Sequence, residues 1–130
     1  MGRPVLFRLA LIAAGGAVGA VLRYTVAGFV QQWTGSVFPW GTLAVNVLGS
    51  FVIGLLWALS EVAPLGPRWT PFVFVGVLGA FTTFSTYALE SLNLLRDGEV
   101  RLALFNVVLN NGLTLAAVAL GFFAVRLLLR

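Results

Sequence analysis

The residues best suited to chemistry in this chain are hydroxyls and amides that lie inside apolar segments. The segment GAFTTFSTY, residues 79–87, places Thr82, Thr83, Ser85 and Thr86 around Phe84. Polar groups in an apolar environment are costly unless they are hydrogen-bonded. Either the helix breaks here and exposes backbone groups in a protein-lined site, or each hydroxyl bonds back to a preceding carbonyl within an unbroken helix. The glycine-rich VGVLGA before the cluster favours the break.

Two further groups of polar residues recur at four-residue steps. Thr42 and Asn46 occur in GTLAVN, and Asn106, Asn110 and Thr114 occur farther along the chain. Residues four apart share one face of a helix, so the second group forms a stripe about 12 Å long. A single residue of this kind is explained by an interhelical hydrogen bond. A stripe together with a matching face on another helix favours a polar pathway.

The pathway predicted from these residues suits a small anion. Its candidate lining groups are amides and hydroxyls, which are neutral and donate hydrogen bonds. No carboxylate lies near the middle of the two polar segments, which argues against a cation or proton relay. Phe84 and Tyr87 can present ring edges, the positive part of the ring quadrupole, to an anion. Arg23 either attracts anions at the mouth of the pathway or extends to the membrane surface.

The chain contains few side chains of the kinds that catalyse reactions in enzymes. The sequence contains no cysteine and no histidine, which removes thiol nucleophiles, thiolate metal ligands and the commonest general base. The acidic residues are scattered along the sequence; they are Glu61, Glu90, Asp97 and Glu99. We therefore predict that the protein is not an enzyme.

The composition indicates that membrane helices position these residues. Of the 130 residues, 60% are hydrophobic and 9% are charged, and the mean hydropathy is +1.02. Soluble domains carry about 25% charged residues, and about 20 apolar residues cross the hydrocarbon core as a helix. The sequence predicts an all-α membrane protein with four such spans, at about residues 5–30, 41–60, 69–96 and 102–126. They form a single transmembrane domain of residues 1–130.

The connections and the arginines agree with this class of protein. The segments QQWTGSVFPW, EVAPLGPR and RDGEVR leave no room for a soluble domain between the spans. All eight basic residues are arginines, and they occur singly at the edges of apolar segments. This placement fits helix-end anchoring and argues against nucleic acid binding. Gly15 and Gly19, one helical turn apart, permit close helix contact, either within one subunit or between subunits.

The motifs, taken in order, resemble the Fluc (CrcB) family of fluoride channels. The chain carries GGAVGAVLRY, GTLAVN and GVLGAFTTFSTYALE, followed by a polar fourth segment that ends LGFFAVRLLLR. The resemblance extends from about Gly15 to Arg130. It implies a fluoride-specific channel in the cell (inner) membrane, which lets fluoride leave passively and so reduces fluoride toxicity inside the cell.

The resemblance also implies an assembly. Members of this family are antiparallel, dual-topology homodimers of four-helix subunits in membrane lipid, with two pores per dimer and a third helix that is broken in mid-membrane. A structural sodium ion (Na+), which is not transported, lies on the two-fold axis. By the motif match, the backbone carbonyls of Gly79 and Thr82 bind this ion.

The resemblance assigns pore positions residue by residue. The polar pore positions correspond to Thr42, Asn46, Ser85, Asn110 and Thr114, and the charged positions near the pore route to Arg23 and Glu90. The two pore phenylalanines of the family correspond to Phe84 and Tyr87. The chain departs from the pattern at Tyr87, because tyrosine keeps a ring edge but adds a hydroxyl. Milder departures are Ala80, where a second glycine is usual, and the asparagine at position 110.

The main alternative is a small dual-topology multidrug or guanidinium exporter. Such exporters are also dimers of four short helices, and a glutamate embedded in the first helix couples proton and cation. The first apolar segment of this chain has no acidic residue. A membrane scaffold that transports nothing would explain the glycines and tryptophans, but it would not explain the stripe of asparagines and threonine.

Overall fold

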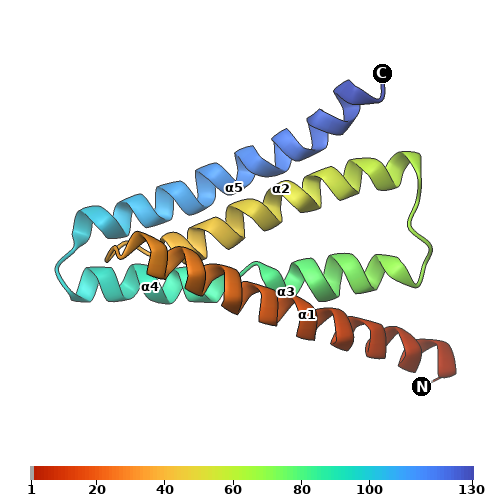
Figure 1. The fold of residues 1–130 in the computed structure, drawn as a ribbon, viewed down its shortest axis with the longest axis horizontal. Helices are drawn as coiled ribbons and strands as arrows, with labels where there is room; N and C mark the ends of the chain where they lie inside the picture. The colour runs from red at the N-terminus through yellow and green to blue at the C-terminus, as the bar shows by residue number, and fades with distance from the viewer. Residues whose placement is uncertain (1) are drawn as a thin grey trace.

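The computed structural model describes residues 2–130 and consists of helices joined by short connections (Figure 1). The elements are α1 (Arg3–Thr34), α2 (Trp40–Val62), the π-helical segment η1 (Pro71–Leu78), α3 (Gly79–Phe81), α4 (Phe84–Arg96) and α5 (Val100–Leu128). Within residues 2–130, four helical stretches are long and apolar enough to cross a membrane, at Arg3–Thr34, Trp40–Val62, Pro71–Arg96 and Val100–Leu128. This confirms the predicted all-helical architecture with four membrane-crossing stretches.

The turn between α1 and α2 is organised by one side chain. Gly35 closes α1 in the left-handed conformation, with φ 57°, which favours glycine. The Gln31 amide then bridges the turn, because Nε2 donates to Ser36 O at 2.7 Å and Oε1 accepts from Gly41 N at 3.1 Å. These bonds fix where α2 begins and therefore where its polar face lies.

Glycines bring α1 into close contact with η1. Gly15 and Gly19 are the buried residues of α1. A Cβ atom on Gly15 would lie 3.1 Å from Gly76 Cα, and one on Gly76 would lie 2.9 Å from Gly15 Cα. A Cβ atom on Gly19 would collide with the backbone carbonyl of Val77. Of the two alternatives for these glycines, the structure therefore shows close packing within one subunit.

The most extensive helix pair is α2 with α5, which lie alongside each other in Figure 1. Gly54 of α2 faces the backbone of Val118, and Gly121 of α5 faces the backbone of Phe51. Because neither glycine has room for a side chain, the two helix backbones approach closely. The polar faces of α2 and α5 are therefore held next to each other.

Two residues with extended backbone separate α3 from α4. Thr82 has φ −85° and ψ 156°, and Thr83 has φ −149° and ψ 121°. Thr83 is the N-cap of α4, because its Oγ1 accepts from Thr86 N at 3.3 Å. Thr82 Oγ1 instead donates to the carbonyl of Leu78 at 3.1 Å. The hydroxyls of the cluster therefore satisfy the backbone on both sides of the separation.

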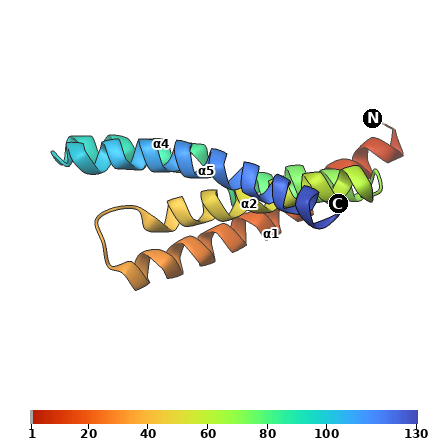
Figure 2. The ribbon, with the colours of Figure 1, turned by 90° about the horizontal axis from the view of Figure 1, so that it is seen from above.

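The two ends of the described chain lie at one end of the bundle. In Figures 1 and 2 the start of α1 and the end of α5 lie at the same end of the bundle as the connection between α2 and η1, whereas the α1–α2 and α4–α5 connections lie at the opposite end. This is the arrangement that four successive crossings require.

Candidate functional site

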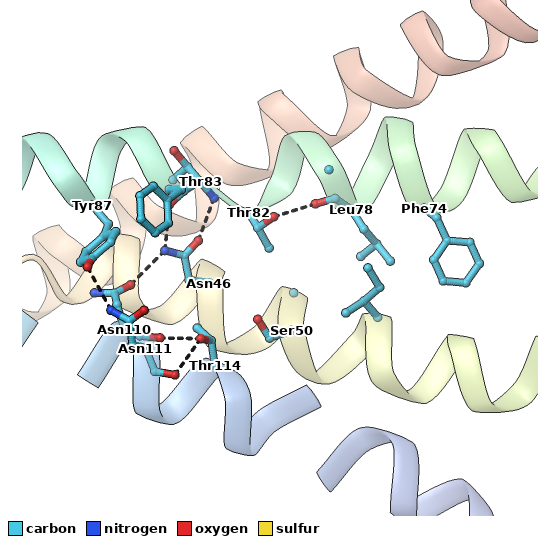
Figure 3. Close-up of a pocket in the computed structure, with 14 residues that line it drawn as sticks. Asn46, Ser50, Phe74, Leu78, Thr82, Thr83, Tyr87, Asn110, Asn111 and Thr114 are labelled. Carbon is cyan, nitrogen blue, oxygen red and sulfur yellow. Dashed lines mark hydrogen bonds between the residues drawn. The ribbon is translucent and has the colours of Figure 1, made fainter. Parts of the chain in front are cut away.

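A cavity of about 320 Å³ lies where α2, α5 and the junction of α3 with α4 meet (Figure 3). We call it the Tyr87 cavity. Its polar lining residues are Asn46, Ser50, Thr82, Thr83, Tyr87, Asn110, Asn111 and Thr114. Glycines and apolar side chains complete it: Gly49, Ile53, Phe74, Leu78, Gly79 and Phe84. Among the described residues 2–130, none that lines this cavity has a charged side chain.

Asn46 joins three helices at the inner wall of this cavity. Its Oδ1 accepts from the backbone N of Thr83 at 2.7 Å. Its Nδ2 donates to Thr83 O and to Asn110 Oδ1, both at 2.9 Å. Figure 3 shows the amide between these partners. The side chain therefore supplies the backbone N–H of Thr83 with the partner that a continuous helix would have provided, and it adds a donor to the N-cap carbonyl of the same residue.

A row of amides extends from Asn46 along α5. Asn110 Nδ2 donates to Asn106 Oδ1 at 2.8 Å, and Asn106 Nδ2 donates to Ser91 Oγ at 2.9 Å. Ser91 Oγ in turn donates to Tyr87 O at 2.9 Å. Asn106 is fully buried. Each amide orientation is fixed by its neighbour, so the row holds Asn46 and Asn110 in one arrangement.

Tyr87 and Phe84 form the aromatic part of the cavity. Their ring centroids are 5.0 Å apart with an interplanar angle of 77°, so one ring presents its edge to the other. Tyr87 is buried, whereas Phe84 is 73% exposed in the single chain. The Tyr87 hydroxyl accepts a hydrogen bond from Asn111 Nδ2 at 3.0 Å.

A second cavity, of about 550 Å³, lies on the other side of the junction between α3 and α4. We call it the Arg23 cavity, because Arg23 of α1, Thr42 of α2 and Glu90 of α4 line it. Thr42 Oγ1 donates to Glu90 Oε1 at 2.7 Å. Within residues 2–130, Arg23 Nε and Glu90 Oε2 are buried without a hydrogen-bond partner. Arg23 is therefore part of the lining of this cavity, and its Nε lies buried within the protein.

The two cavities meet at one residue. Thr83 lines both of them. It is also the residue whose backbone N–H donates to the Asn46 side chain. Thr42 and Asn46, four residues apart on α2, lie on opposite sides of this partition, since Thr42 lines the Arg23 cavity and Asn46 the Tyr87 cavity. The polar face of α2 thus runs from one cavity to the other.

The carbonyls predicted to bind sodium have chemistry that suits a hard cation. In an unbroken helix, Thr83 N would donate to Gly79 O, but it donates to Asn46 Oδ1 instead. Within residues 2–130, no side chain and no backbone N–H outside the helices donates to the carbonyl of Gly79 or Thr82. Oxygen atoms left unpaired in this way are the ligands that hard cations prefer.

Most of the predicted site residues lie in these two cavities. The Tyr87 cavity brings together Asn46, Gly79, Thr82, Phe84, Tyr87, Asn110 and Thr114, and the Arg23 cavity brings together Arg23, Thr42 and Glu90. Ser85 is exposed in the single chain and lines neither cavity.

The sequence analysis did not predict Asn111 and Ser50 as lining residues. It also did not predict the hydrogen bonds between the Asn46 side chain and the backbone of Thr83. Asn111 follows Asn110 directly, so it carried a signal only through its polar type inside an apolar segment.

Comparison with known proteins identifies the family. The family model described as CrcB-like protein, Camphor Resistance (CrcB), matches residues 10–122. A protein of Shewanella amazonensis named fluoride-specific ion channel FluC is 53% identical over 110 residues, which cover 85% of this chain and 89% of the relative. A protein of Magnetococcus marinus with the same name is 48% identical over 122 residues, which cover 93% and 99%. The chain is thus a multi-pass membrane protein that belongs to the CrcB family.

Proposed function

We propose that this protein is a fluoride-specific ion channel through which fluoride leaves the cell passively. The observation that carries the proposal is the pair of cavities that meet at Thr83, one lined by an arginine with a buried Nε and the other by neutral hydrogen-bond donors. The name shared by the relatives from Shewanella amazonensis and Magnetococcus marinus supports the same ion.

The physical requirement for fluoride conduction is replacement of its water. A small, strongly hydrated anion enters a narrow site only where hydrogen-bond donors compensate for its lost hydration. Arg23 attracts the anion into the first cavity, where Thr42 donates to Oε1 of Glu90. Asn46 and the backbone of Thr83 form the partition that the anion passes. Beyond it, Asn110, Thr114 and the edges of the Phe84 and Tyr87 rings line the exit.

We propose that two copies assemble as an antiparallel, dual-topology homodimer with two pores in the cell (inner) membrane. The Tyr87 cavity is incomplete in one chain, because Phe84 is 73% exposed there. A second copy would cover this ring and the exposed backbone at Gly79. We also propose that Thr82 and Thr83 form a break of the third span inside the membrane. Extended backbone at that depth is tolerated only when it is buried in protein or lines a site.

A structural sodium ion would fit the carbonyls of Gly79 and Thr82 from both copies. Such an ion would supply positive charge that holds the two chains together. Its role would be assembly, at carbonyls of two residues that also line the Tyr87 cavity.

The multidrug or guanidinium exporter is not favoured. Its coupling chemistry needs an acidic residue in the first helix, and α1 contains none between Arg3 and Thr34. An exporter of cations would also have little use for a cavity lined by amide and hydroxyl donors.

Fluoride efflux from liposomes tests the proposal directly. Purified protein is reconstituted in vesicles loaded with potassium fluoride, and valinomycin is added while a fluoride electrode follows the outside solution. We expect rapid fluoride release and no comparable release of chloride from matched vesicles. If protein-loaded vesicles release fluoride no faster than empty ones, the channel proposal is wrong.

A further inference from the structure

We infer that the Tyr87 hydroxyl donates a hydrogen bond to the anion in the Tyr87 cavity, and that Asn111 is the positioning residue that directs it there. The inference rests on the proposed fluoride pathway and deepens it. It gives the tyrosine hydroxyl a role of its own, since the phenylalanine that the resemblance implies at this position would offer only a ring edge.

The orientation of the Asn111 amide carries the first step. Asn111 Nδ2 donates to the backbone carbonyl of Val107, one turn earlier on α5, at 2.8 Å. A carbonyl accepts only, so the nitrogen and not the oxygen of this amide must face it. The second proton of the same nitrogen points to Tyr87 Oη, 3.0 Å away. Asn111 is therefore fixed as the donor and Tyr87 as the acceptor in the contact that Figure 3 marks with a dashed line.

The second step concerns the proton of the Tyr87 hydroxyl. Because Oη accepts from Asn111, its own proton cannot point along that bond. Within residues 2–130, no hydrogen bond from this hydroxyl to an acceptor is found. The side chain lines the Tyr87 cavity, where the described part of the chain contributes no charged group. The proton is therefore available to an anion in that cavity.

The Tyr87 ring is held so that this donor is placed in advance. The side chain is 7% exposed and packs edge-on with Phe84. Its backbone carbonyl accepts from Ser91 Oγ at 2.9 Å and from Asn106 Nδ2 at 3.4 Å, which anchors this turn of α4 to α5. A donor that is already oriented loses little freedom when the anion arrives.

An O–H donor binds an anion more strongly than a ring edge does. Hydrogen bonds to charged groups are among the strongest in proteins and are shorter than neutral ones. Loss of one such bond weakens binding by about ten-fold or more. Tyr87→Phe removes the hydroxyl and keeps the ring, so it should raise the fluoride concentration that is needed to saturate conduction.

The experiment measures initial fluoride efflux from liposomes as a function of fluoride concentration. The variants are Tyr87→Phe, Asn111→Leu and the double variant. Asn93→Leu is the matched control, since Asn93 is exposed on α4 and lines neither cavity. We expect Tyr87→Phe to conduct with a half-saturating fluoride concentration raised about ten-fold or more. Asn111→Leu should raise it by a smaller factor, and it should add nothing in the Tyr87→Phe background.

Asn111→Asp provides a second variant if the leucine does not assemble. Its carboxylate accepts the tyrosine proton and turns it away from the cavity, so its effect should be larger with Tyr87 than in the Tyr87→Phe background. A half-saturating concentration within two-fold of wild type for Tyr87→Phe would overturn the inference. Equal effects of the Asn111 changes in both backgrounds would overturn the role of Asn111. Absence of any efflux from wild-type protein would instead overturn the proposed function, and this inference with it.

Discussion

Asn46→Asp removes two hydrogen-bond donors from the partition between the cavities while keeping the size of the side chain. The bond from Thr83 N to the remaining oxygen is retained. The second oxygen now faces Thr83 O and Asn110 Oδ1, two acceptors that lay 2.9 Å from the amide nitrogen. The donors of the partition are lost, and an additional acceptor replaces them.

The size of the effect follows from the donors lost. A hydrogen bond to a charged group contributes about 1.5–3 kcal/mol, and 1.4 kcal/mol corresponds to a factor of about ten. If a dehydrated fluoride ion uses one or both protons of Nδ2 as it passes, the flux falls by at least about ten-fold with one and about 100-fold with both. For Asn46→Ala the cost to the fold is smaller, because side-chain hydrogen bonds in membrane bundles average about 0.6 kcal/mol each. Asn46→Asp also buries a carboxylate beside two acceptor oxygens, so Asn46→Ala is the variant that tests assembly. We therefore expect loss of flux and retention of the assembled protein.

The assay pairs fluoride efflux with size-exclusion chromatography of the same preparation. Asn46→Ala tests the loss of all three hydrogen bonds of this side chain. Ser60→Ala is the control, because Ser60 lies on the same helix but lines neither the Tyr87 cavity nor the Arg23 cavity. The control should conduct within a few-fold of wild type. Flux within three-fold of wild type for Asn46→Asp or Asn46→Ala would remove Asn46 from the pathway.

Three other changes test the packing, the electrostatics and the assembly. Gly19→Val places a side chain against the Val77 carbonyl and should destabilise the protein by about 1–3 kcal/mol, measured as a lower midpoint of thermal unfolding. Gly16→Val is the control and should be nearly neutral, because a Cβ atom on Gly16 would meet nothing within 4 Å. Arg23→Gln should reduce efflux several-fold at low ionic strength and less at high; the same ratio at both would contradict a role in attracting anions. Replacing sodium by N-methylglucamine throughout purification should weaken assembly or efflux, and indifference to sodium would count against the central ion.

The membrane-crossing stretches were predictable because their signal is local. An uninterrupted apolar segment of about 20 residues forms few structures other than a membrane-spanning helix. The bounds were less accurate for α1, predicted at about residues 5–30 and found at Arg3–Thr34. Polar residues such as Gln31 ended the apolar segment, but backbone hydrogen bonds continue until Gly35 closes the helix. The π-helical segment η1 had no signal in its composition.

The partners of each site residue were less predictable than its position. Four-residue spacing placed Thr42 with Asn46 and aligned Asn106 with Asn110. It could not show that Asn46 donates to Asn110 across two helices, because that contact depends on how closely α2 and α5 approach. Asn111 lies about 100° around the helix from Asn110. Helical periodicity alone therefore predicts that its side chain lies on a different face from the polar stripe. It reaches the cavity because Tyr87 is long enough to meet it.

The position of the two chain ends has a consequence for single-chain versions of the channel. Because both termini emerge at the same end of the bundle, a short linker between two copies would make them parallel. An antiparallel pair encoded in one polypeptide would need a linker that itself crosses the bilayer once. Two tandem fusions would therefore behave differently, one with a flexible soluble linker and one with an added apolar helix. If the pair is antiparallel, only the fusion with the added helix would conduct as the separate chains do.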